Sequence, residues 1–80
     1  METITGKRIL QSLYEKQIIG AKHTSTDNAT KCLPKNMRGD GEKILKQLRK
    51  QGYINFHPNS YGMEVSLNPT KIVEIRKIIR

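Results

Sequence analysis

Apolar residues recur at the three- and four-residue spacing of an α-helix in three parts of the chain. In the first part, Ile9 and Leu13 fall on one side of a helical wheel, and the pattern predicts a helix over about residues 5–19. We expect Thr5 to cap the N-terminus of this helix and Gly20 to end it.

The next stretch, "AKHTSTDN", is rich in small polar residues and could hold a short extended piece. Thr26 or Asp27 could cap a brief second helix that runs through Leu33. Because Pro34 disfavours helical geometry at the residue before it, this helix is expected to end there.

The second strongly periodic part predicts a basic amphipathic helix over residues 40–51, with Asp40 as its N-cap and Gly52 in the left-handed position after its end. Leu45 and Leu48 belong to its apolar stripe, and Arg49 lies on a flank. The side opposite the stripe carries three lysines with a glutamine beside them: Lys43, Lys46, Lys50 and Gln47.

Alternation of apolar and polar residues then predicts two strands, over residues 53–56 and 63–67, joined by the turn-forming loop "HPNSYG" into a β-hairpin. Asn68 and Pro69 are expected to open the last helix, as N-cap and first helical residue. Its apolar side is expected to close the core and consists of Ile72, Ile75, Ile78 and Ile79.

The chain has 80 residues, so we expect one domain over residues 1–80. It has no tryptophan and one phenylalanine, and aliphatic side chains must therefore form the core. A single cysteine excludes an internal disulfide, and no apolar run resembles a signal peptide or a membrane span. We therefore expect a cytoplasmic protein with no membrane partner.

Positive charge is in large excess, with 15 Lys and Arg against 7 Asp and Glu, which gives a net charge of +8. The excess is greatest over residues 27–52, the segment that contains the basic helix. This balance favours a polyanionic partner such as DNA, RNA or an anionic lipid surface.

No arrangement of residues predicts catalysis or a bound metal. His23, Cys32 and His57 match no pair of closely spaced metal ligands, and they are expected to be isolated side chains. Cys32 is expected to be a small buried apolar residue. The prediction is a protein that is not an enzyme and has no cofactor.

The segment Leu48-Arg49-Lys50-Gln51-Gly52-Tyr53-Ile54, with a hairpin after it, resembles the end of the third helix in winged helix-turn-helix DNA-binding proteins. The order helix, short helix, basic helix, hairpin, helix resembles the same family over nearly the whole chain. The run "YGMEVSLNPTKIVEI" is also similar to small archaeal winged-helix proteins. The resemblance implies an α+β winged helix: a three-helix helix-turn-helix core, a two-stranded hairpin wing and a C-terminal helix.

In such proteins the third helix recognises the nucleic acid and the hairpin loop is the wing. The resemblance implies that Lys43, Lys46, Gln47 and Lys50 form the recognition face, with Lys35 and Arg38 in the turn before it and Asn59, Ser60 and Tyr61 at the wing tip. Gln47 could read adenine, and Arg38 and Arg49 could read guanine. The wing tip lacks the usual Lys or Arg, and the two glycines of "MRGDG" imply a late or flexible start of the recognition helix.

We therefore expect a small transcription regulator that binds double-stranded DNA by placing the basic helix in the major groove. A protein-interaction module with the same fold is the alternative, because winged helices look alike whichever partner they bind. RNA as the partner and a homodimer both stay open.

Overall fold

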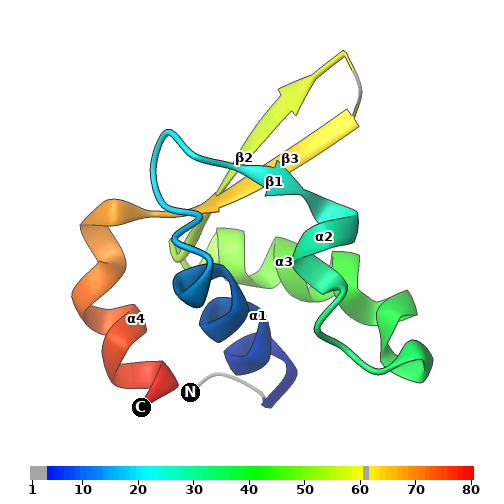
Figure 1. Cartoon of the computed structure of the whole chain (residues 1–80), viewed down its shortest axis with the longest axis horizontal. Helices are drawn as coiled ribbons and strands as arrows, with labels where there is room; N and C mark the ends of the chain where they lie inside the picture. The colour runs from blue at the N-terminus through cyan, green and yellow to red at the C-terminus, as the bar shows by residue number, and fades with distance from the viewer. Residues whose placement is uncertain (1–3, 61) are drawn as a thin grey trace.

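The computed structural model describes residues 4–60 and 62–80, which form an α+β fold with a three-stranded antiparallel sheet (Figure 1). The elements, with η for 3₁₀ helices, are α1 (Ile4–Glu15), β1 (Thr24–Ser25), α2 (Thr26–Thr30), η1 (Lys35–Asp40), α3 (Gly41–Lys50), β2 (Ile54–Asn59), β3 (Gly62–Leu67), η2 (Pro69–Lys71) and α4 (Ile72–Ile79). None of the helices over these residues is long and apolar enough to cross a membrane.

The sheet has the strand order β1-β3-β2. Strands β2 and β3 form the predicted hairpin, in a register that runs from Ile54 opposite Leu67 to Asn59 opposite Gly62. Both strands are longer than predicted, because Pro58 and Asn59 continue the ladder and do not belong to the turn. Figure 1 shows the helices beneath the sheet and the hairpin projecting past them.

The core is aliphatic, as the composition requires. One face of the sheet packs against α1, α2 and α3, and α4 closes the core beside α1, as predicted. The buried apolar residues are Ile9, Leu10, Leu13, Ile18, Ala29, Leu33, Leu45, Leu48, Ile54, Val65, Leu67 and Ile75. Cys32 is only partly buried, so the prediction of a buried residue was wrong.

The first helix is shorter than predicted, and the prediction that Gly20 ends it was wrong. Gln17 has φ of +58° and ends the helix in a Schellman motif, in which the Ile18 N–H donates to the Leu13 carbonyl at 2.9 Å. The chain then turns to the sheet edge, where the Ile18 carbonyl accepts the Leu67 N–H at 2.8 Å. Thr5 lies within α1 and so is not its cap.

The second helix is also shorter than predicted. Ser25 caps α2, and its hydroxyl accepts the Asn28 N–H at 3.2 Å. The predicted extended piece is present as β1. The prediction that Thr26 or Asp27 caps the helix was wrong, because both residues lie inside α2 and a cap residue is not helical. Leu33 lies beyond the end of α2, in the loop before η1.

Helix α3 begins at Gly41, directly after η1, and the prediction that Asp40 caps it was wrong. Because η1 runs directly into α3, Asp40 has helical backbone angles and its side chain makes no capping hydrogen bond. Gly41 is buried against α2: a Cβ there would lie 2.5 Å from Thr30 Cγ2, whereas one on Gly39 would meet nothing within 4 Å.

The end of α3 confirms the prediction for Gly52, which has φ of +88°. The Tyr53 N–H donates to the Leu48 carbonyl at 3.0 Å, so this end is a second Schellman motif. The prediction for Asn68 is confirmed as well, since its Oδ1 accepts the Thr70 N–H at 3.1 Å, although the first turn after it is the 3₁₀ helix η2.

Candidate nucleic-acid interface

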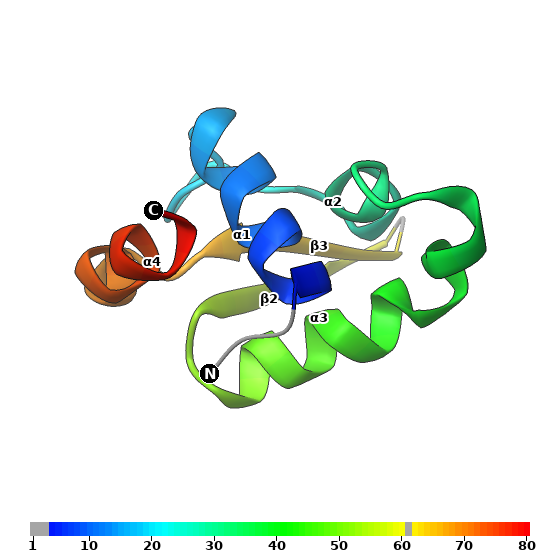
Figure 2. The same cartoon turned by 90° about the horizontal axis from the view of Figure 1, so that it is seen from below.

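Helix α3 separates its apolar and basic residues cleanly. Leu45 and Leu48 are fully buried. The exposed side carries four predicted site residues, Lys43, Lys46, Gln47 and Lys50. We call these four residues the α3 face. Figure 2 shows α3 along one side of the molecule, opposite α2 and the later part of α1, and no other helix or strand of residues 4–60 and 62–80 lies beyond it on that side.

Helix α3 is held firmly at both ends. At its start, Gly41 allows close contact with Thr30 of α2. At its end, the Gly52 carbonyl accepts a hydrogen bond from Asn68 Nδ2 at 2.8 Å, which ties α3 to the segment that leads into η2. Because both ends are fixed and the apolar stripe is buried, the α3 face is presented on a rigid element.

The lysines of the α3 face extend into solvent. Lys46 Nζ lies 4.0 Å from Glu42 Oε1, but both side chains are largely exposed, and such surface pairs contribute little. The ammonium groups are therefore available to an incoming anion. Asp40 and Glu42 are both exposed near the N-terminal end of α3, which reduces the positive charge there.

Arg49 does not join the α3 face. Its guanidinium carbon lies 5.1 Å from the centroid of the Phe56 ring, a cation–π contact between α3 and β2. On the helical wheel Arg49 lies about 100° from Lys50 and about 60° from Lys46. The side chain is therefore on the flank of α3 beside Lys46, where it contacts Phe56 of β2.

Arg38 is also engaged within the protein. Its Nε donates to the Leu33 carbonyl at 3.2 Å and its Nη2 donates to the Lys31 carbonyl at 3.3 Å. The guanidinium thus holds together the loop between α2 and η1. Lys35 is exposed at the start of η1.

The wing contributes no lysine or arginine, since none occurs between Tyr53 and Leu67. Asn59, predicted at the wing tip, is the last residue of β2, and its Nδ2 donates to Glu64 Oε1 at 2.9 Å. Ser60 is exposed in the turn. The predicted site residue Tyr61 lies outside the described residues.

The outer face of the sheet holds a polar cluster that the sequence interpretation missed. His23 and His57 were expected to be isolated, but their rings stack with centroids 4.7 Å apart. His23 Nδ1 lies 2.7 Å from Glu64 Oε1, and His57 Nε2 lies 2.8 Å from Oγ of the buried Ser66. The strand register places His57 opposite Glu64, and this register was the signal that could have revealed the cluster.

The His23–His57 cluster is not arranged as a metal site. No group of three or more His, Cys, Asp or Glu residues within residues 4–60 and 62–80 could hold a metal ion. The two imidazoles lie nearly parallel, with 24° between their planes, and each is hydrogen-bonded to a neighbour on β3. The cluster therefore joins β2 and the residue before β1 to β3.

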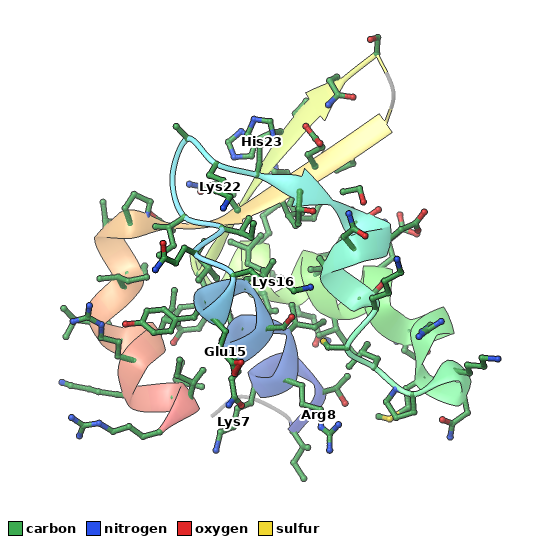
Figure 3. All side chains as sticks on the ribbon, viewed as in Figure 1. Lys7, Arg8, Glu15, Lys16, Lys22 and His23 are labelled. Atoms are coloured by element: carbon green, nitrogen blue, oxygen red, sulfur yellow. The ribbon has the colours of Figure 1, made fainter. Side chains whose placement is uncertain are left out.

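Further basic side chains lie around α1, as Figure 3 shows for Lys7, Arg8, Lys16 and Lys22. Two of them make contacts to backbone carbonyls: Lys7 Nζ lies 3.4 Å from the Arg80 oxygen, and Lys22 Nζ lies 3.4 Å from the Lys16 oxygen. These residues come from different segments and are mixed with Glu15. They do not line up along one exposed helix face as the α3 lysines do.

No protein-family model matches this sequence, and neither a curated protein nor a solved structure is significantly similar to it.

Proposed function

We propose that this protein is a winged-helix DNA-binding protein, acting as a small transcription regulator, and that α3 enters the major groove of double-stranded DNA. The observation that carries the proposal is the α3 face: three lysines on the exposed side of a helix that is fixed at both ends. The arrangement of helices, three-stranded sheet and projecting hairpin is compatible with a winged helix.

The dimensions of α3 suit this role. The major groove of B-DNA, about 12 Å wide, admits an α-helix. Lys43 and Lys50 are seven residues apart, about 10 Å along the helix axis at a rise of about 1.5 Å per residue. Their flexible side chains can reach phosphates along the groove while Gln47 on the same face meets the base edges.

A protein-interaction module is the second candidate, and the wing favours it. The hairpin carries no Lys or Arg, and its one acidic residue is Glu64, whose carboxylate contacts His23 and Asn59. Such a hairpin is better suited to a protein partner than to insertion into a minor groove, where basic side chains are favoured.

Charge reversal on α3 tests the proposal. Lys43→Glu combined with Lys50→Glu is expected to abolish binding to a 20-base-pair duplex, measured by fluorescence anisotropy, because two phosphate contacts are replaced by repulsion. Both side chains are exposed, so circular dichroism should show an unchanged fold.

The matched control is Lys16→Glu, just after α1, combined with Lys77→Glu on α4. It changes the net charge of the protein by the same amount as the α3 pair. This control should lose much less affinity. If both pairs weaken binding alike, attraction comes from net charge alone and the α3 assignment is wrong. If neither wild type nor variants bind DNA, a search for protein partners should follow.

A further inference from the structure

The side chains that could read bases are mostly committed to other contacts. We infer that the α3 face binds double-stranded DNA through its phosphates, with little preference for base sequence. This inference rests on the proposed function and defines its substrate class: duplex DNA of any sequence.

Arg38 is the first side chain whose use in base reading the structure restricts. A bidentate contact to guanine needs two neighbouring N–H groups of one guanidinium. In Arg38 the Nε and Nη2 groups already donate to the carbonyls of Leu33 and Lys31. A contact to guanine through this Nε–Nη2 edge would break both hydrogen bonds and release the loop that leads into η1 and α3, and the same two bonds fix the direction of the free Nη1–Nη2 edge.

Arg49 is the second side chain whose use in base reading the structure restricts. Its guanidinium lies over the Phe56 ring, on the flank of α3 that faces β2. The α3 lysines lie on the neighbouring side of the helix. If that side enters a DNA groove, Arg49 lies at the rim of the groove. This position suits contact with the sugar-phosphate backbone, which carries no sequence information directly.

The wing supplies no other basic side chain that could read bases. Minor-groove readers insert Arg or Lys, and the hairpin has neither. The amide of Asn59 already donates to Glu64, whose carboxylate also contacts His23. The wing therefore adds no cationic contact through which sequence could be read.

The candidates for base contact that remain are the residues of the α3 face, which are three lysines and one glutamine. A lysine is a flexible point charge that suits phosphates better than the fixed pattern of a base pair. Gln47 can form one bidentate contact to adenine, which gives discrimination of about 5- to 150-fold. Sequence-specific DNA-binding proteins typically prefer their site by about 10³- to 10⁷-fold, so one glutamine falls short of that range.

The test compares duplexes at one salt concentration. Sequences are selected from a randomised 20-base-pair pool, and the tightest is compared by anisotropy with a duplex made only of G·C pairs. We expect the two affinities to differ by less than about 150-fold, and Gln47→Ala to bring the ratio close to one. Asn55→Ala, at an exposed amide on β2, is the matched control and should leave the ratio unchanged.

A ratio above about 150-fold would overturn the inference while supporting the proposed function, because tight sequence-dependent binding is still DNA binding. A ratio well above one that Gln47→Ala leaves unchanged would also overturn it, since another side chain would then be reading bases. If the folded protein binds no duplex at low salt, the proposed function fails and the inference fails with it.

Discussion

Replacement of Gly41 by alanine tests how closely α3 is packed in the fold. A Cβ at this position would lie 2.5 Å from Thr30 Cγ2, about 0.9 Å less than the 3.4 Å at which ordinary contact begins. Thr30 cannot rotate away freely, because its Oγ1 donates to the Thr26 carbonyl at 3.0 Å. Either this hydrogen bond breaks or α3 moves away from α2.

The size of the effect follows from these alternatives. Overpacking a close contact costs about 1–3 kcal/mol, and losing the hydrogen bond costs about 0.5–1.5 kcal/mol. Alanine gains at most about 1 kcal/mol over glycine within a helix, and less at its first residue, which Gly41 is. We expect Gly41→Ala to lower the free energy of unfolding by about 1–2 kcal/mol, or Tm by roughly 4–16 °C.

Thermal and urea unfolding followed by circular dichroism give this difference. Gly39→Ala is the matched control, because a Cβ there meets nothing within 4 Å and stability should be unchanged or slightly raised. Adding Thr30→Ser to Gly41→Ala removes the clashing methyl group, keeps the hydroxyl and should restore part of the loss. If Gly41→Ala is as stable as Gly39→Ala, the close contact between α2 and α3 does not exist.

Two further changes test the ends of the helices. Gln17→Gly should raise the free energy of unfolding by about 0.5–1 kcal/mol, because glycine adopts the left-handed geometry of the α1 end without strain; urea unfolding measures it, and a loss would show that the Gln17 side chain stabilises the fold. Asn68→Ala should lower it by about 1–2 kcal/mol, since both the Thr70 cap and the bond to the Gly52 carbonyl are lost; an unchanged Tm would contradict this role.

The sequence predicted the elements whose signals are local. Gly52 ends α3 as expected because glycine is the residue that favours the left-handed conformation, and Asn68 begins the last helical segment because its side chain serves a neighbouring N–H. The end of α1 was predicted wrongly because its signal is not local. Gln17 rarely adopts a positive φ, and only the hydrogen bonds of Ile18 and Gly20 to Leu67, far along the chain, explain why it does.

The candidate site was predicted only in part, for a similar reason. The exposed lysines of α3 followed from the helical wheel, since exposure of a side chain depends on the face it occupies. The contacts of Arg38 and Arg49 could not be predicted in this way. Their partners, the Leu33 carbonyl and the Phe56 ring, are identified only by the tertiary structure. The stacking of His23 on His57 likewise depends on where β1 joins the sheet.

The salt dependence of DNA binding tests the central claim most directly. If Lys43, Lys46 and Lys50 each neutralise one phosphate, these three contacts should together contribute about −2.7 to the slope of a plot of the logarithm of affinity against the logarithm of salt concentration, at about 0.9 per phosphate. Replacing one of them, as in Lys46→Gln, should make the slope shallower by about 0.9, whereas Lys77→Gln should not change it. A slope that stays the same in Lys46→Gln, or no binding of the folded protein at low salt, would contradict the claim that the α3 face binds DNA.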